Sequence, residues 1–551
     1  MTTTSDRPAG STLRALRRRL AGSALARALR LPAPTHHYTV SSVNIPMRDG
    51  VDLVADHYEP VGEVVGTLLA RGPYGRAFPF SLIFAYLHAA RGYRVILQSV
   101  RGTFGSGGTF NPMVNEVADG ADTVAWLRRQ PWFTGRFATI GVSYLGFTQW
   151  AMLEDPPPEL AAAVITAGPH DLSASAWGTG SFTVNDFLGW SNLVAHQEDP
   201  GRIREGIRQL RAQKSIVRTA GEVPLGAAGR ALLGEAATWW ESWLTPPQTE
   251  DPFWGSLRVP GALDRVDVPV LLLSGWQDLF LPQTLQQYRQ LRDRGVDVAM
   301  SMGPWSHTQL LVAGLPTIAK ETGEWLDTHL AGRPAEARAS RVRFFVTNEG
   351  WREAPDWPPA TTDHVLYLQP GGGLAETSPA EGFSASFRYD PAEPTPTLGG
   401  RLLSPDGGYC DDSALAARRD VLSFTSDELT ADLRVFGNPI AELVHSSDNA
   451  FVDVFVRISE VDAKGRSRNV SDAYRRLDGR TGGGTVRLEL DATAHRFRAG
   501  TRIRVLIAGG SHPRFARNLG TGEATATGSE LRPSVHEVYF GTSRIVLPVG
   551  S

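Results

Sequence analysis

The sequence predicts a doubly wound α/β sheet that carries a helical insertion and is followed by an all-β sandwich. Apolar, β-branched runs alternate with helical stretches over residues 36–171 and 257–341. This alternation of strand-like and helical stretches stops between 172 and 256, a segment that is rich in tryptophan. Short alternating strands separated by turns rich in Gly, Pro and Asp fill residues 342–551. Residues 1–35 form a basic, helix-prone N-terminal arm.

The core begins with two stretches that are typical of buried parallel strands ending in glycine-rich loops, "VGTLLARGPYG" (65–75) and "GYRVILQSVRG" (92–102). A helical pattern at 116–130 then leads into a third strand, "FATIGVSYLG" (137–146). The succession of strand, helix and strand indicates a parallel sheet with crossover helices.

Helical patterns dominate the insertion, at 185–197, 201–220 and 234–244. The strand rhythm returns with "VDVPVLLLSGWQD" (266–278) and "VDVAMSMGPWSH" (296–307). The insertion is therefore expected to form a helical cap between two strands of one sheet. The alternating segments of the C-terminal region, "VRFFVTNEG" (first residue 342), "AFVDVFVRISEV", "GTVRLELDA" and "TRIRVLIAGG", predict a sandwich.

Composition narrows the class of protein. The chain has 551 residues, which is too many for one core, and 42% of them are hydrophobic, as in a globular protein. A net charge of −3 gives no general attraction to nucleic acid or to an anionic membrane. No apolar run approaches the ~20 residues that span a bilayer. Cys410, the only cysteine, excludes an intrachain disulfide and a zinc site built from several thiolates.

The N-terminal arm bears on location. Arg27 and Arg30 interrupt what would be the apolar core of a signal peptide, so we expect a cytoplasmic protein. A degenerate twin-arginine export signal is the alternative interpretation.

Ser143 is the candidate nucleophile because it follows a predicted strand within "GVSYLG". A nucleophile elbow usually reads G-x-S-x-G, since small neighbours let strand and helix approach each other. Here Gly141 occupies the −2 position, but Leu145 stands at +2 and the second glycine, Gly146, at +3. The local pattern alone does not distinguish a nucleophile from a polar loop serine.

Two distant residues favour the nucleophile. Asp278 and His307 follow the next two predicted strands, so both should lie at the same sheet edge as Ser143. The chain order Ser, Asp, His is that of α/β-hydrolases. His170 and Asp171 follow "LAAAVITAG" and remain rivals for base and acid, although His170 as the base would break that order.

An oxyanion hole is the next requirement of such a site. The backbone N–H of Tyr144, the residue after the nucleophile, is the expected first donor. A second donor should come from the loop after residues 65–72, where Tyr74 offers a phenol. A packed loop aromatic is the competing interpretation of Tyr74.

Five stretches together resemble the cocaine esterase and Xaa-Pro dipeptidyl peptidase family of α/β-hydrolases: "RGPYGR", "RGTFGSGG", "GVSYLG", "GWQDLF" and "GPWSH". The resemblance extends from about residue 36 to the C-terminus, where "HPRFARN" is similar to the family's jelly-roll domain. It implies a hydrolase core, a helical cap and a C-terminal jelly roll. It also implies the triad Ser143, Asp278 and His307, a phenolic oxyanion donor at Tyr74, and glycine at +3.

The same resemblance implies an aromatic acyl pocket. "SAWGTG" and "FLGWSNL" look like cap segments that line it, which suggests Trp177 and Trp190 as walls, and Phe280 matches an aromatic after the acid. The competing interpretation makes these tryptophans cap core. "DLFLPQ" carries no carboxylate beyond Asp278, which argues against the family branch that binds α-amino acid esters.

These inferences predict a serine esterase that cleaves a small carboxylic ester, or an amide, through an acyl-enzyme. An acyltransferase, an Xaa-Pro dipeptidyl peptidase and a non-catalytic binding protein are the alternatives. No cofactor or metal is implied, because no phosphate-binding loop with its lysine and no histidine–carboxylate cluster appears. The sandwich is expected to shape the pocket rim, with carbohydrate binding as the other interpretation. The oligomeric state cannot be read from the sequence.

Overall fold

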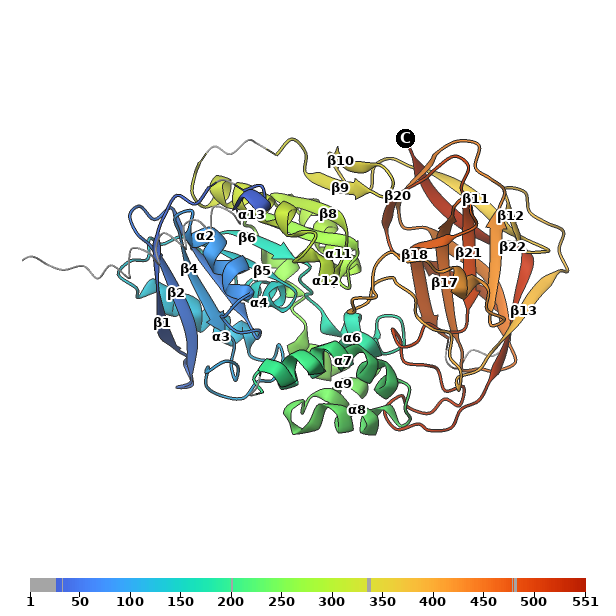
Figure 1. The fold of residues 1–551 in the computed structure, drawn as a ribbon, viewed down its shortest axis with the longest axis horizontal. Helices are drawn as coiled ribbons and strands as arrows, with labels where there is room; N and C mark the ends of the chain where they lie inside the picture. Colours follow the sequence, from blue (N-terminus) through green and yellow to red (C-terminus); the bar gives the residue numbers. More distant parts are fainter. Residues whose placement is uncertain (1–25, 32, 200–201, 334–337, 478, 480–482) are drawn as a thin grey trace, which may run out of the picture.

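The computed structural model describes residues 26–31, 33–199, 202–333, 338–477, 479 and 483–551. It shows three parts side by side: a helix-flanked sheet, a helical cap below its edge, and a second, all-β unit (Figure 1). The predicted N-terminal arm, 1–35, lies outside the described residues except at 26–31 and 33–35. No helix in the described ranges is both long and apolar enough to cross a membrane.

The first sheet has ten strands in the described part of the chain, in the order β1-β2-β4-β3-β5-β6-β7-β8-β9-β10. Pairing is parallel from β4 through β9, whereas β1, β2 and β10 run antiparallel to their neighbours. The strands are β1 (Tyr38–Pro46), β2 (Asp52–Pro60), β3 (Gly66–Gly72), β4 (Tyr93–Ser99), β5 (Phe137–Val142), β6 (Leu160–Thr166), β7 (Val270–Gln277), β8 (Val298–Ser306), β9 (Val342–Val346) and β10 (Gly350–Ala354).

Helices cover both faces of this sheet and enclose an apolar core on each side. Strands β4, β5 and β7 are buried along their whole length, as the continuous apolar runs predicted. The flanking helices are η1 (Ser81–Tyr86), α2 (Leu87–Ala89), α3 (Glu116–Arg128), α4 (Tyr144–Met152), α10 (Gly261–Arg265), α11 (Leu281–Asp293), α12 (His307–Leu310) and α13 (Leu315–His329).

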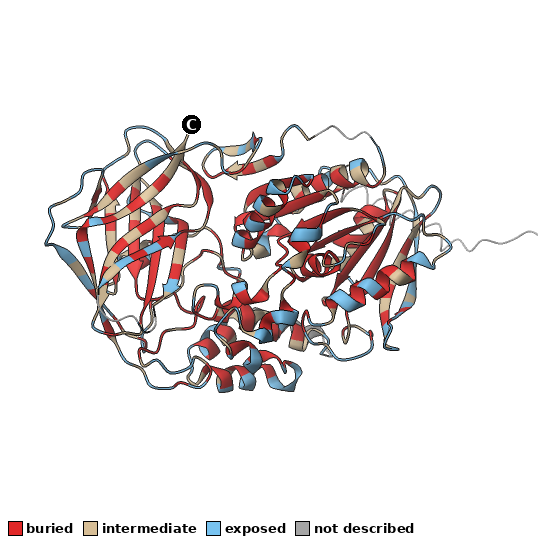
Figure 2. Ribbon diagram, turned by 180° about the vertical axis from the view of Figure 1, so that it is seen from behind, coloured by how far each residue is buried: buried red, intermediate tan, exposed pale blue. Residues whose placement is uncertain are grey.

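The cap joins β6 to β7, as predicted for residues 172–256. Its helices are α5 (Leu172–Trp177), α6 (Val184–His196), α7 (Arg202–Ala220), α8 (Leu225–Leu233), η2 (Gly234–Ala236), α9 (Trp240–Leu244) and η3 (Pro252–Leu257). Packed aromatic rings hold these short helices together, with Phe182 in contact with Trp177, Phe187 and Trp240. The cap helices carry buried and exposed residues in alternation along their length, as expected of helices that cover a core on one face (Figure 2).

The C-terminal unit is an all-β jelly-roll domain with its own apolar core. Its strands are β11 (Thr362–Gln369), β12 (Gly373–Ala375), β13 (Ser384–Tyr389), β14 (Val421–Ser426), β15 (Leu433–Gly437), β16 (Ile440–Ser447), β17 (Asp453–Val461), β18 (Ser467–Arg476), β19 (Gly484–Glu489), β20 (Thr493–Phe497), β21 (Arg502–Ala508) and β22 (Ser534–Gly550). A short helix, α14 (Ser413–Ala416), precedes β14.

Sheet pairing continues across the predicted domain boundary between 341 and 342. Strand β9 pairs in parallel with β8, and β10 pairs with β9, so both belong to the first sheet. The first sheet therefore extends to Ala354. The segment "VRFFV" has the alternating pattern of a strand in either sheet, and its composition does not say which sheet it joins.

Candidate active site

Ser143 lies on a strained turn between β5 and α4. Its backbone has φ 58° and ψ −120°, a left-handed conformation that is unfavourable for a residue with a side chain. Such a turn presents the hydroxyl beyond the carboxyl edge of the sheet, as in a nucleophile elbow.

The packing around this turn explains why the second glycine stands at +3. A Cβ at Gly146 would lie 2.4 Å from the Cα of Gly168, so α4 and the chain after β6 touch through backbone alone. Leu145, at +2, finds room because residue 72 is also glycine, where a Cβ would lie 2.2 Å from the leucine Cδ1. The leucine at +2 is thus accommodated by a glycine at the end of β3.

Asp278 and His307 meet as the strand order predicts. The Nδ1 atom of His307 lies 2.7 Å from Oδ2 of Asp278, whose side chain is fully buried. The other carboxylate oxygen accepts a 2.7 Å bond from the backbone N–H of Phe280. An ionised carboxylate only accepts hydrogen bonds, so Nδ1 carries the proton and Nε2 is left as the basic nitrogen.

The two rivals have other partners. Asp171 caps α5, where its carboxylate accepts from Ala174 N and Ser173 Oγ. His170 is buried beside Gln287, whose Nε2 lies 3.0 Å from its Nδ1, and burial lowers the pKa of His170 to about 4. Within the described residues, neither His170 nor Asp171 forms a hydrogen bond or an ion pair with His307, whose partner is Asp278.

Tyr74 extends from the loop after β3 toward Ser143. Its ring stacks on Phe80 with centroids 5.3 Å apart, and its hydroxyl oxygen accepts a 3.0 Å bond from Nε1 of Trp190. Burial raises the pKa of Tyr74, while side-chain hydrogen bonds with Trp190 and Ser143 act in the opposite direction. The phenol is therefore a neutral donor at neutral pH, which is what an oxyanion site requires.

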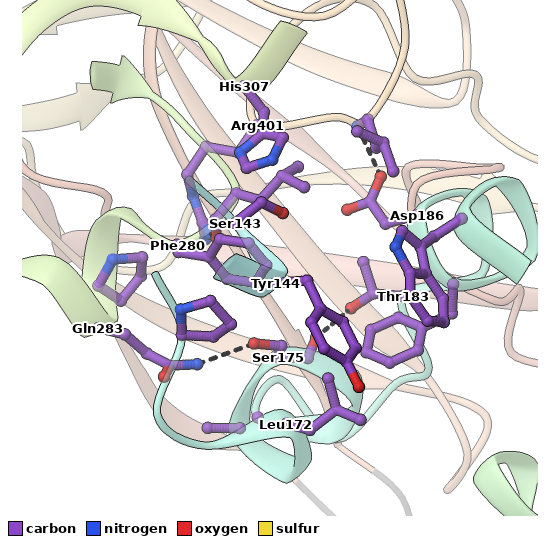
Figure 3. Close-up of a pocket in the computed structure, with 18 of the residues that line it drawn as sticks. Ser143, Tyr144, Leu172, Ser175, Thr183, Asp186, Phe280, Gln283, His307 and Arg401 are labelled. Carbon is purple, nitrogen blue, oxygen red and sulfur yellow. Dashed lines mark hydrogen bonds between the residues drawn. The ribbon is translucent and has the colours of Figure 1, made fainter. Parts of the chain in front are cut away.

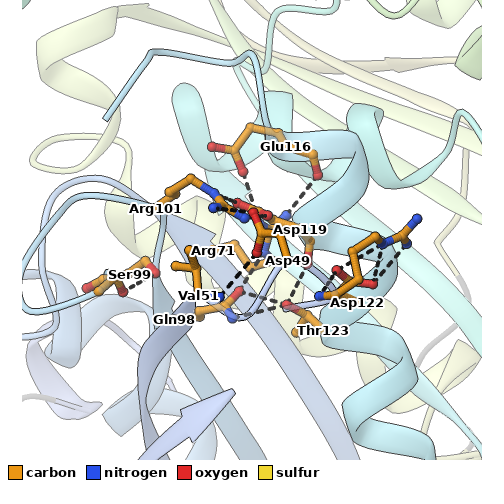
Figure 4. Close-up of polar contacts among 12 residues, drawn as sticks. Asp49, Val51, Arg71, Gln98, Ser99, Arg101, Glu116, Asp119, Asp122 and Thr123 are labelled. Atoms are coloured by element: carbon orange, nitrogen blue, oxygen red, sulfur yellow. Dashed lines mark hydrogen bonds and ion pairs between the residues drawn. The ribbon is translucent and has the colours of Figure 1, made fainter. Parts of the chain in front are cut away.

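Tyr144 is the first residue of α4, so its backbone N–H has no partner within the helix. Its side chain points away into a buried network: the hydroxyl donates to Oε1 of Glu116 at 2.8 Å and accepts from Met113 N at 2.7 Å. Glu116 in turn faces Arg71 at 3.1 Å, and both side chains are almost fully buried (Figure 4). This network fixes the helix end on which Ser143 sits.

Ser143, His307 and Tyr74 open onto one cavity of about 540 Å³. It lies between sheet, cap and β unit, and most of its wall is apolar or aromatic; Phe80, Leu172, Phe187, Trp190, Trp243, Phe280 and Leu311 contribute. Figure 3 shows Ser143 and His307 on one side of the cavity and Asp186 across from them. The volume suits a small organic molecule.

Two of the three predicted pocket residues line this cavity. Trp190 forms part of its wall, and Phe280 packs edge-on against the His307 ring with centroids 5.4 Å apart. The prediction for Trp177 is corrected: its side chain is 3% exposed and its Nε1 donates to the carbonyl of Trp243. Trp177 therefore lies in the cap core, behind the residues that face the cavity.

Three charged residues that sequence reasoning missed also line the cavity: Asp186 on α6, Arg401 from the loop before α14, and Arg514 from the segment after β21. Arg401 donates to the carbonyl of Leu279, next to the acid, at 2.9 Å and pairs with Asp491 at 2.5 Å. The backbone N–H of Leu403 donates to Asp186 at 2.7 Å. The β domain thus supplies part of the site, through residues too distant in sequence to be assigned from a local motif.

Comparisons with known proteins agree with this architecture. Family models match residues 49–309, as X-Pro dipeptidyl-peptidase (S15 family), and residues 335–544, as the X-Pro dipeptidyl-peptidase C-terminal non-catalytic domain. The chain is 31% identical to the cocaine esterase of Rhodococcus sp., over 93% of this chain and 99% of that protein. The chain belongs to the S15 family. The resemblance seen in the sequence motifs is confirmed. The two family models cover the α/β sheet with its cap and the C-terminal jelly roll, respectively.

Two solved structures support the same fold for this S15 protein. An aminopeptidase from a marine sediment Thaumarchaeota archaeon superposes with a TM-score of 0.80 at 24% identity, covering 93% of this chain and 97% of that one. An α-amino acid ester hydrolase superposes with a TM-score of 0.78 at 22% identity, with the same coverage. Because sheet, cap and jelly roll are all shared, the relative arrangement of the three parts is a property of the fold.

Proposed function

We propose that this S15 family member is a serine ester hydrolase that forms an acyl-enzyme on Ser143. One observation carries the proposal: an imidazole paired to a buried carboxylate at 2.7 Å faces the same cavity as a serine on a strained strand-to-helix turn. Serine, histidine and aspartate in these roles perform acyl transfer to water.

The reaction follows from this geometry. His307 takes the Ser143 proton at Nε2 as the hydroxyl oxygen attacks the ester carbonyl carbon. Asp278 holds the imidazole orientation and stabilises the imidazolium that forms. The tetrahedral oxyanion accepts hydrogen bonds from the Tyr74 hydroxyl and the Tyr144 backbone N–H, and each such donor is worth about 3 kcal/mol. His307 then protonates the leaving alcohol, and water releases the acid by the same steps.

The cavity wall supports the choice of substrate class. Apolar and aromatic side chains surround the space beside Ser143, so a bulky or aromatic acyl group gains the most from burial. Small esters of such acids are the proposed substrates.

A fluorophosphonate probe tests the nucleophile, because it reacts only with an activated serine. The wild-type protein should be labelled, and Ser143→Ala should lose both labelling and at least about 10,000-fold of its activity on benzoyl and p-nitrophenyl esters. Ser175→Ala is the matched control, since Ser175 lines the same cavity but accepts a hydrogen bond from Gln283. Labelling that survives in Ser143→Ala, or an Xaa-Pro amide cleaved faster than every ester, would contradict the proposal.

A further inference from the structure

The indole of Trp190 is hydrogen-bonded to the phenol of Tyr74, with Nε1 3.0 Å from the hydroxyl oxygen. An indole N–H donates and cannot accept, so the phenol oxygen is the acceptor in this pair. The proton of Tyr74 must therefore point away from Trp190. Tyr74 and Ser143 both line the cavity, so a proton that points away from Trp190 can be directed at a group bound beside Ser143.

Trp190 is itself held in a fixed orientation. Its ring is nearly parallel to that of Tyr144, at an interplanar angle of 8° and a centroid distance of 6.1 Å. The rings of Phe110, Trp239 and Trp243 pack around it at 5.8 to 6.4 Å. A side chain confined on several sides gives its hydrogen bond a constant direction.

The helix that carries Trp190 also holds the Tyr74 loop at a second point. Gln197, which ends α6, donates from Nε2 to the carbonyl of Pro73 at 2.8 Å. The cap thus contacts both the backbone before Tyr74 and its hydroxyl oxygen. The position of Tyr74 is set by the cap as well as by β3.

We infer that Trp190 is a positioning residue, which directs the Tyr74 proton toward the oxyanion that develops at Ser143. The inference rests on the proposed function and adds a role for α6 beyond that of an apolar wall. A donor that points at the oxyanion before the reaction begins needs no reorientation in the transition state. The indole bond also polarises the phenol, which strengthens its own donation.

This role predicts an effect on the chemical step rather than on substrate binding. In Trp190→Phe an aromatic ring remains in the wall but the N–H is lost, so kcat should fall by about tenfold with KM changed by less than about threefold. Tyr74→Phe removes the donor itself and should lower kcat by about 100-fold. Because Trp190 acts through Tyr74, adding Trp190→Phe to Tyr74→Phe should cause little further loss.

Trp239→Phe is the matched control. Trp239 belongs to the same ring cluster, and its indole N–H also donates to a hydroxyl, that of Ser191, but it is not part of the cavity wall. Phenylalanine at position 239 keeps an aromatic ring beside Trp190, so the indole stays confined and kcat should remain within about twofold of the wild type. Binding of a boronic acid, which mimics the tetrahedral intermediate, should weaken in Trp190→Phe in proportion to kcat and not in Trp239→Phe.

The outcomes separate this inference from the proposed function. A wild-type protein that neither reacts with fluorophosphonate nor cleaves esters contradicts the proposed function. If the wild type is labelled and active, multiplicative losses in the double variant overturn the positioning role and leave Trp190 as a pocket wall. A rise in KM with unchanged kcat in Trp190→Phe, or an equal loss in Trp239→Phe, overturns it too.

Discussion

At the scale of single residues, Asp186 is the least expected feature of the cavity. Its side chain is 8% exposed, and one oxygen accepts from Leu403 N and Asn185 Nδ2. The second oxygen has no hydrogen-bond partner in the described part of the chain. Burial raises the pKa of Asp186, although these bonds and the more distant Arg514 and Arg401 oppose that rise. A carboxylate with one unused oxygen facing a pocket is equipped to accept a bond from a substrate N–H.

Asp186→Asn tests that role. For a substrate that carries a protonated amine, kcat/KM should fall about tenfold or more, because a charge-assisted hydrogen bond is worth about 1.5–3 kcal/mol. The matched neutral ester should change by less than about twofold. Steady-state kinetics on the two esters checks this, and an equal loss on both would show that Asp186 only supports the fold.

At the scale of elements, the contact between α4 and the chain after β6 sets the position of the nucleophile. Gly146→Ala places a methyl group 2.4 Å from the Gly168 Cα, a backbone atom that cannot move aside alone. The variant should lose about 1–3 kcal/mol of unfolding free energy and at least about tenfold in kcat, because overpacking displaces the helix that carries Ser143.

The control for this contact is Gly323→Ala in α13, where the added methyl meets nothing within 4 Å. It should stabilise the protein by up to about 1 kcal/mol through helix propensity and leave kcat unchanged. Urea unfolding and ester hydrolysis, measured on both variants, decide the point. Full activity in Gly146→Ala would mean that the elbow tolerates a wider approach.

The sequence predicted those elements whose signal is local. Strand rhythm and motif position placed Ser143, Asp278 and His307 at one sheet edge, because parallel strands bring their carboxyl ends together. It could not assign β9 to the first sheet, since sheet membership depends on long-range pairing. It also could not separate Trp177 from Trp190, because helix orientation in the cap decides which indole faces the cavity. Asp186 was not predicted because the sequence argument considered carboxylates only in the segment directly after Asp278, whereas Asp186 lies on a cap helix.

At the scale of the whole molecule, buried histidines are distributed over both main units. Burial lowers the pKa of His88 and His536 to about 3, and of His170 and His512 to about 4. His88 and His170 belong to the core sheet region, and His512 and His536 belong to the jelly roll. All four are neutral in the folded protein over a pH range in which the unfolded chain takes up protons.

The free energy of unfolding should therefore depend steeply on pH below neutrality. Each folded pKa lies below the ordinary value of 6.5, so the contribution is complete above that value. It is lost as the pH falls toward about 4 for His170 and His512 and toward about 3 for His88 and His536. Each histidine adds about 1.4 kcal/mol per pH unit to the slope. Urea unfolding measured from pH 7 to pH 5 should show this loss.

His88→Gln should reduce the slope of unfolding free energy against pH by about 1.4 kcal/mol per pH unit, the contribution of one proton. The same change at the exposed His37 should not, because solvent reaches that ring in both states. A slope that His88→Gln leaves unchanged would place the acid sensitivity in other groups.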